Sequence, residues 1–161
     1  MIKAFTLLFT TVLIAACASQ PSFKDEGIDH TLTPTMAKQD RISSGDKVIW
    51  GGTILSSQNL KNKTRLEILS YPVDKKGRID KDAEPGGRFY AIYDNYLETA
   101  EYRKSRWVSL TGKFVGKEAG KVGEADYTFP VVNISQLHLW PVESTNQRSP
   151  NVQFGIGVLF H

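Results

Sequence analysis

The chain has 161 residues, of which 40% are hydrophobic and 23% charged, with a formal net charge of +3. This length allows one ordinary domain with tails, and the hydrophobic fraction is too high for a disordered chain. The single cysteine excludes a disulfide framework and a thiolate-cluster zinc site, and the small positive excess lacks the concentrated charge of nucleic-acid-binding domains, so we expect no nucleic-acid partner.

The chain begins with the pattern of a secretory signal. Lys3 supplies a positive charge, an apolar run covers residues 4–14, and small residues follow it. The run is too short to span a bilayer core, which needs about 20 apolar residues. Ile14-Ala15-Ala16-Cys17 resembles the lipobox of bacterial lipoproteins, in which the cysteine is acylated and the signal is cut before it. This resemblance implies a signal peptide over residues 1–16 and lipidation of Cys17; the alternative is an ordinary signal peptide with a chance cysteine.

Residues 17–45 are expected to form the acylated amino terminus and a flexible tether. They carry few large apolar side chains, although a short segment near Leu32 and Met36 has the apolar groups needed to dock on a domain. Ser19 resembles the outer-membrane class of enteric lipoproteins, since Asp at that place retains a lipoprotein at the inner membrane. We therefore expect a lipid anchor in the outer membrane, with the domain facing the periplasm.

From residue 46 the pattern becomes that of short β-strands. Three runs are rich in β-forming residues: 48–55, 64–69 and 88–93. Gly51 and Gly52 lie inside the first run and mark a bend or bulge of the kind that a small barrel needs. Between the second and third runs, the charged residues and glycines of 74–87 predict a long exposed loop.

A short helix and two strands are expected next. Asp94 or Asn95 can cap a helix that ends near Arg103. The last two strands are expected around a Gly/Lys-rich turn: 107–116, the turn 116–123, and 127–140. Three strands, a helix and two strands are the order of the five-stranded OB-type barrel. The sequence therefore predicts an all-β, OB-like barrel over residues 46–142, with its helix between strands three and four; a six- or seven-stranded open sandwich fits the same runs.

Residues 143–161 are expected to form a C-terminal extension that ends in a strand. Five apolar side chains alternate with small or polar ones from 151 to 161: Val152, Phe154, Ile156, Val158 and Phe160. Such a strand closes the barrel, covers its edge, or meets another protein or the membrane. Burial in the core is the simplest outcome, because large exposed apolar patches are rare.

Several spaced motifs between residues 45 and 141 resemble one family. They include Val48-Ile49-Trp50-Gly51-Gly52-Thr53-Ile54, Leu66-Glu67-Ile68-Leu69-Ser70-Tyr71-Pro72-Val73-Asp74, Leu110-Thr111-Gly112 and Phe129-Pro130-Val131-Val132. Together with the lipobox they are similar to the starvation-inducible outer-membrane lipoprotein family, Slp. The resemblance implies a lipid-anchored, non-enzymatic protein that supports envelope integrity or stress survival. It carries over no catalytic residue, and Cys17 is its only functional residue; Thr99 and Ile79 stand where the family has proline.

No cofactor or metal is expected from the remaining residues. The three histidines, His30, His138 and His161, lack the spacing of metal ligands. With Cys17 acylated, no thiol nucleophile remains. An envelope enzyme is therefore the weakest hypothesis, because the sequence offers no acid–base or nucleophile constellation.

A second hypothesis is a ligand-binding face. Arg88, Tyr90, Arg106 and Trp107 combine cations with aromatic rings, as OB folds do when they bind polyanions or sugars. The expected target is peptidoglycan, lipopolysaccharide or another envelope partner. The alternative is that the cations are solvated and the aromatic rings belong to the core, and the spread of charge along the chain favours this alternative.

Overall fold

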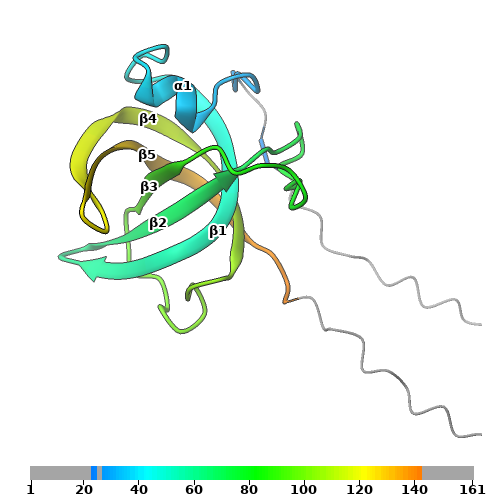
Figure 1. Cartoon of the computed structure of the whole chain (residues 1–161). Helices are drawn as coiled ribbons and strands as arrows, with labels where there is room; N and C mark the ends of the chain where they lie inside the picture. Colours follow the sequence, from blue (N-terminus) through cyan, green and yellow to red (C-terminus); the bar gives the residue numbers. More distant parts are fainter. Residues whose placement is uncertain (1–22, 25–26, 143–161) are drawn as a thin grey trace, which may run out of the picture.

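The structure is a computed structural model that describes residues 23–24 and 27–142. Its strands are β1 (Lys47–Leu60), β2 (Lys63–Tyr71), β3 (Arg88–Tyr93), β4 (Trp107–Val122) and β5 (Ala125–Leu139). They close into a barrel in the order β1-β2-β3-β5-β4 (Figure 1), with β3 and β5 parallel and the other neighbours antiparallel. This is the OB-type order, so the predicted five-stranded OB-like barrel is confirmed.

Alternation along the strands sets which side chains enter the barrel. In β2 each second residue is buried, including Leu66 and Ile68, while their neighbours are partly exposed. At Gly52 of β1, a Cβ would lie 1.9 Å from the carbonyl oxygen of Leu69. Only glycine therefore lets β1 approach β2 so closely, and a register shift between Ile54 and Ser56 bends β1 further around the barrel.

The core fills the barrel interior with apolar side chains from all five strands. The indole of Trp50 is 2% exposed in this core and lies edge-on to Phe89 with ring centroids 5.0 Å apart. The fully buried apolar residues of the same cluster are Val48, Ile54, Leu66, Ile68, Phe89, Ala91, Val108, Leu110 and Val132. At about 25 cal/mol per Å² of buried apolar surface, this cluster supplies the main driving force for folding.

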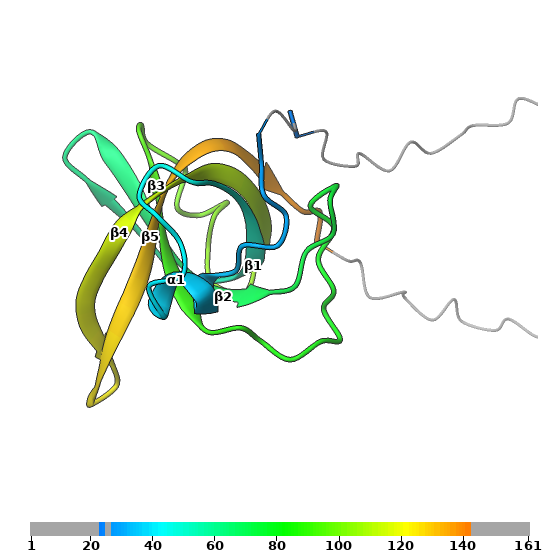
Figure 2. The ribbon, with the colours of Figure 1, turned by 90° about the horizontal axis from the view of Figure 1, so that it is seen from above.

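One end of the barrel is closed by α1 (Pro34–Lys38), which Figure 2 shows lying across the opening. Thr33 caps α1 by accepting a hydrogen bond from the Met36 amide, and Pro34 stands at its first turn. The Trp50 indole donates to the Leu32 carbonyl, 2.8 Å away. Leu32 and Met36 pack against the core, and Ala37 is buried. The part of the chain that lies against the barrel thus begins well before residue 46, inside the expected tether.

The other end is closed by residues 94–106, where the sequence predicts a helix. The segment makes only a single helical turn, in which the Tyr102 amide donates a hydrogen bond to the Glu98 carbonyl. It does not form the longer helix that the sequence predicts. The reason is that Thr64 of β2 holds the segment: its hydroxyl donates to the Asn95 carbonyl and accepts from the Leu97 amide. Leu97 is thereby inserted into the barrel end, where it is 9% exposed.

The predicted turn at 116–123 is instead the outer half of a hairpin. β4 continues to Val122 and pairs with β5 from Ala125 onwards, so only residues 123–124 turn. Neither face of this hairpin enters the main core, so the alternation that signals a strand is weak there. Lys117 binds Asp40 beyond α1 at 2.6 Å, which ties the hairpin to the barrel.

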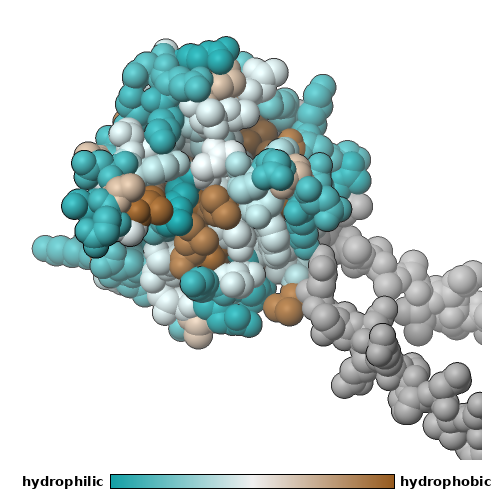
Figure 3. Space-filling model, in the orientation of Figure 1, coloured by the Kyte–Doolittle hydropathy of each residue, from teal (hydrophilic) through white to brown (hydrophobic). Residues whose placement is uncertain are grey.

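The face seen in Figure 3 is mostly polar, with small separate hydrophobic areas. Among the described residues the large hydrophobic side chains that are exposed are Tyr96, Val115 and Val142. No helix within these residues is long and apolar enough to cross a membrane. The signal segment, Cys17 and the expected terminal strand at 151–161 lie outside the described residues.

Candidate functional site

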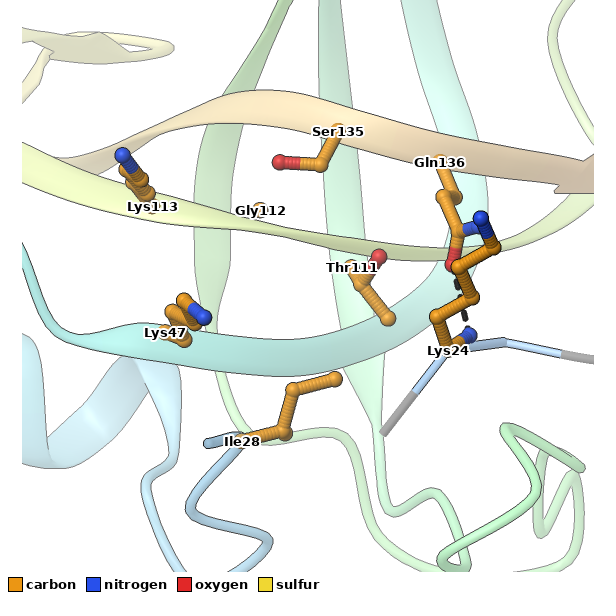
Figure 4. Close-up of a pocket in the computed structure, with 8 residues that line it drawn as sticks. All are labelled: Lys24, Ile28, Lys47, Thr111, Gly112, Lys113, Ser135 and Gln136. Carbon is orange, nitrogen blue, oxygen red and sulfur yellow. Dashed lines mark hydrogen bonds between the residues drawn. The ribbon is translucent and has the colours of Figure 1, made fainter. Parts of the chain in front are cut away.

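A pocket of about 260 Å³ lies on the outside of β4 and β5 (Figure 4). Its polar wall includes Thr111, Ser135 and Gln136, and the Gln136 side chain accepts a hydrogen bond from the Lys24 amide at 2.9 Å. Three lysines surround it: Lys24, Lys47 and Lys113. Figure 4 shows Lys113 pointing away from the pocket and Lys24 on the opposite side, so the three ammonium groups have no common focus for one anion.

Arg88 and Tyr90 lie on the outer face of β2 and β3, which we call the β2–β3 face. The Arg88 guanidinium binds the Glu67 carboxylate across the strands at 2.8 Å. The backbone amide of Arg88 donates a hydrogen bond to the Tyr127 hydroxyl at 2.8 Å. Arg65 on the same face pairs with Glu118 at 3.1 Å. Each arginine of this face therefore already has a carboxylate partner.

The ring of Tyr90 is occupied in the same way. It stacks on Phe129 with centroids 4.2 Å apart and an interplanar angle of 10°, and the Arg65 guanidinium lies 4.7 Å from its centre. Burial first, and the nearby Glu67 carboxylate second, raise the pKa of Tyr90, so its hydroxyl stays protonated near neutral pH. Intramolecular contacts thus occupy the aromatic and cationic groups that a ligand would need here.

Arg106 and Trp107 lie together in a different place, at the start of β4. They line a groove of about 180 Å³ that we call the Arg106–Trp107 groove. Its other lining residues are Lys81, Arg103, Ser105, Pro141 and Val142. Its described lining residues include three cations and no carboxylate, and Trp107 and Val142 give it an apolar side. The structure therefore brings Arg106 and Trp107 together and places Arg88 and Tyr90 on another face.

Backbone carbonyls hold the Arg106 guanidinium in place. Its Nη2 donates to the Trp140 oxygen at 2.9 Å and its Nη1 to the Glu101 oxygen at 3.3 Å. Within the described part of the chain, neither Arg103 nor Arg106 forms a salt bridge with a carboxylate. Carbonyl groups orient a cation without cancelling its charge, so Arg106 keeps its positive charge in the groove.

Ser109 connects this groove to the 72–82 loop. It is fully buried; its hydroxyl donates to the Gly77 carbonyl at 2.6 Å and accepts from the Trp140 indole at 2.8 Å. A Cβ at Gly77 would lie 2.3 Å from the Phe23 ring, so this ring packs directly on the glycine. Phe23, the loop and the groove thus form one continuous structure on the side of the barrel where the described chain begins and ends.

His138 is close to this region but is not a metal ligand of any described cluster. Its ring meets Trp140 edge-on at 4.8 Å, and burial lowers its pKa. Among the residues that the structure describes, no group of three or more His, Cys, Asp or Glu side chains is placed to hold a metal ion.

Comparison with known sequences decides the family. Residues 14–157 match the outer membrane lipoprotein Slp family. The chain belongs to this family. Outer membrane protein Slp of Escherichia coli is 26% identical over 168 residues, which cover 99% of this chain and 87% of the relative. An uncharacterized protein of Haemophilus influenzae is 29% identical over 144 residues, which cover 87% of this chain and 78% of the relative. The uncharacterized lipoprotein YeaY of E. coli is 31% identical over 96 residues, which cover 60% of this chain and 49% of the relative.

This Slp-family chain is thus an outer-membrane lipoprotein, as its sequence motifs predict. Among solved structures, it resembles the mitochondrial single-stranded DNA-binding protein Rim1 of S. cerevisiae, with a TM-score of 0.38 and 16% identity over 59% of this chain and 94% of that one. It also resembles Schizosaccharomyces pombe Pot1pC bound to ssDNA, with a TM-score of 0.32 and 8% identity over 78% and 90% of the two chains. The assignment to the OB-type rests on the strand order of the chain itself.

Sequence reasoning places Arg103 with Arg106 on a basic face but misses other residues that complete the groove. Lys81 comes from the long loop, and Pro141 and Val142 come from the chain after β5. Their positions in the sequence give no sign that they meet. Ser109 could have been noticed, because a serine between Val108 and Leu110 on a buried strand needs a hydrogen-bond partner.

Proposed function

We propose that the chain is anchored to the outer membrane through an acylated Cys17 and acts there as a non-enzymatic component that supports envelope integrity under stress. The observation that carries this proposal is the position of Cys17. It is the only cysteine of the sequence, it ends a lipobox-like motif, and it lies within the residues that match the lipoprotein family. Each methylene of an acyl chain contributes about 0.8 kcal/mol to membrane attachment, and two chains suffice for stable anchoring.

The test is membrane fractionation of cells that produce the wild-type chain or Cys17→Ala. We expect the wild type in the outer-membrane fraction and Cys17→Ala released or retained with its signal uncut. Ala18→Ser is the matched control and should fractionate like the wild type. A Cys17→Ala protein that stays in the outer membrane after signal cleavage would contradict the anchor.

The stress role is tested in the same strains. Cells that lack the chain should lose viability in stationary phase or leak periplasmic protein, and the wild-type gene should restore them. Cys17→Ala should fail to restore them, because a protein away from the membrane cannot support it. Complementation by Cys17→Ala would contradict a role at the membrane.

A second candidate function is a periplasm-facing OB-like module that binds a glycan or a polyanionic envelope ligand. The Arg106–Trp107 groove favours it, because Arg103 and Arg106, which pair with no carboxylate among the described residues, lie beside an aromatic ring. On the β2–β3 face the arginines are paired, so Arg88→Gln should leave such binding unchanged while Arg103→Gln weakens it. Titration with peptidoglycan fragments and with lipopolysaccharide checks this, and binding unaffected by Arg103→Gln would count against the groove.

A further inference from the structure

We infer that the side of the barrel that carries the Arg106–Trp107 groove docks on the phospholipid headgroups of the leaflet that holds the acyl chains. This inference rests on the proposed anchor at Cys17, and it adds an orientation: the groove side faces the membrane, and the tips of the β1–β2 and β4–β5 hairpins on the opposite side face the periplasm. The occupant of the groove is then the headgroup layer itself, with its phosphate groups next to the cations.

The short length of chain between the anchor and the barrel limits how far the barrel can lie from the membrane. Six Cα–Cα steps separate Cys17 from Phe23. Even a fully extended chain of this length spans at most about 22 Å. Phe23 is fixed, because its ring packs on Gly77. Phe23 therefore cannot lie farther than this distance from the acylated residue, and the Gly77 loop lies one side-chain contact beyond it. This is much less than a freely swinging tether over 17–45 would allow.

The second step is that Phe23 and the groove are parts of one structure. Gly77 is joined to Ser109, and Ser109 to the Trp140 indole. The Trp140 carbonyl binds Arg106, and the Trp140 amide donates to the Trp107 carbonyl at 2.9 Å. Figure 1 shows the described ends of the chain on the side away from the β1–β2 and β4–β5 hairpin tips, and Figure 2 agrees. A short tether therefore brings this side to the bilayer.

The third step is the chemistry of the surface. Tryptophan and tyrosine are the side chains that concentrate at membrane–water interfaces, and Lys and Arg bind anionic phospholipids. Trp107 is half-buried, with Tyr71 edge-on to it at 5.0 Å and the Lys81 ammonium 5.3 Å from its ring centre. Val142, at the mouth of the groove, is 62% exposed. Aromatic rings, cations and one exposed apolar side chain fit a headgroup layer and not the hydrocarbon core.

The test uses the full acylated chain in vesicles of phosphatidylethanolamine and phosphatidylglycerol. Headgroup spin-labelled phospholipid quenches tryptophan fluorescence only at short range. Each of Trp50, Trp107 and Trp140 is left as the single tryptophan by replacing the other two with phenylalanine. We expect strong quenching of Trp107 and Trp140 and little quenching of Trp50, which is 2% exposed in the core. Flotation of the vesicles reports anchoring separately.

Charge variants sharpen the test. Each cation near an anionic surface favours association by roughly fivefold, so Lys81→Gln with Arg103→Gln should lower the ratio of docked to undocked barrel roughly 25-fold. Quenching of Trp107 should then be lost while flotation is kept. The matched control is Lys61→Gln with Lys121→Gln at the hairpin tips, which removes the same charge and should keep the quenching. The wild-type chain, with all three tryptophans, is measured beside these variants. Because Trp50 is 2% exposed in the core, strong quenching of the wild type must come from Trp107 or Trp140, so this measurement decides even where a variant fails to fold.

The outcomes separate the two proposals. Absence of flotation by the wild type would overturn the anchor and the docking together. Flotation without quenching of Trp107 and Trp140 would overturn the docking alone, and this result is also expected if residues 143–161, a glycan or a protein fills the groove. Equal loss of quenching in the groove variant and in the hairpin control would also overturn it.

Discussion

The β2–β3 face and the Arg106–Trp107 groove contain the same kinds of residue but use them differently. On the β2–β3 face, Arg88 is paired with Glu67 and Tyr90 is stacked on Phe129. In the groove, backbone carbonyls hold Arg106, and the half-buried Trp107 ring borders open space. A list of cations and aromatic rings therefore does not identify a binding surface. The partner of each cation identifies it, because a carboxylate neutralises the charge of a cation, whereas a carbonyl group only orients it.

The difference also separates stability from interaction. A face whose groups satisfy one another adds to the stability of the fold, whereas arginines that no described carboxylate pairs, such as Arg103 and Arg106, are available to an external partner. The contacts that join Phe23 to the groove run through Gly77 and Ser109 and do not involve the β2–β3 face.

Phe129→Ala should destabilise the protein most. Its ring is fully buried between Tyr90 and Tyr127, so its loss leaves a cavity and lowers the free energy of unfolding by about 3–5 kcal/mol. Trp107→Ala, in the groove, should cost clearly less, because the ring is only half-buried. Urea unfolding followed by circular dichroism measures both. Equal losses would show that the groove ring serves the core as much as Phe129 does.

Ser109→Ala should have an intermediate effect. It removes the acceptor of the Trp140 indole and the donor to the Gly77 carbonyl, at a cost of about 1–3 kcal/mol in the free energy of unfolding. The Trp140 fluorescence should also change, because its indole loses its partner. Ser57→Ala is the control: the Ser57 hydroxyl is buried without a hydrogen-bond partner, so its removal should cost nothing. A Ser109→Ala protein as stable as the wild type would contradict the link between loop and groove.

The pairing of Arg88 with Glu67 should contribute little but measurably. A double-mutant cycle of Arg88→Gln and Glu67→Gln should give a coupling of about 0.5–1 kcal/mol that falls as salt is added, since both side chains are partly exposed. Arg106→Gln should instead lower the free energy of unfolding by an amount that does not change with salt, because the partners of Arg106 are carbonyl groups. A coupling of zero would mean that the Arg88–Glu67 pair does not stabilise the fold, and that the charges of the β2–β3 face are as available as those of the groove.

His138 should give a small pH dependence. Burial holds its pKa below the ordinary value of 6.5 in the folded chain, so the unfolded chain binds more protons as the pH falls. The free energy of unfolding should therefore be unaffected above about pH 6.5 and decline as the pH drops from there through the lowered pKa. His138→Gln should remove this part of the decline. Urea midpoints between pH 8 and pH 5 measure it, and identical slopes for the two proteins would refute it.

Local pattern was enough to predict the barrel. The third run, 88–93, matches β3, and the alternation around Leu66 and Ile68 gave the buried face of β2. The order of runs also predicted the OB-type topology. These features depend on alternation and turn chemistry, which neighbouring residues determine.

Features that depend on distant contacts were beyond the sequence. The single helical turn before Arg103 is held by Thr64, some thirty residues earlier in the chain. The hairpin after Gly116 is recognisable only once β5 pairs with it. Likewise, the four candidate residues Arg88, Tyr90, Arg106 and Trp107 lie on two different surfaces. The partners of the two arginines also differ: Arg88 pairs with Glu67, whereas Arg106 binds the carbonyl of Trp140. Partners this far apart leave no local signature.

Mass spectrometry of the amino-terminal peptide from protein purified out of native outer membranes tests the account most directly. The account predicts a peptide that begins at Cys17 and carries acyl groups on its sulfur and amino terminus. An unmodified peptide, or one that still contains residues before Cys17, would contradict it, and the membrane-facing orientation of the barrel would fall with it.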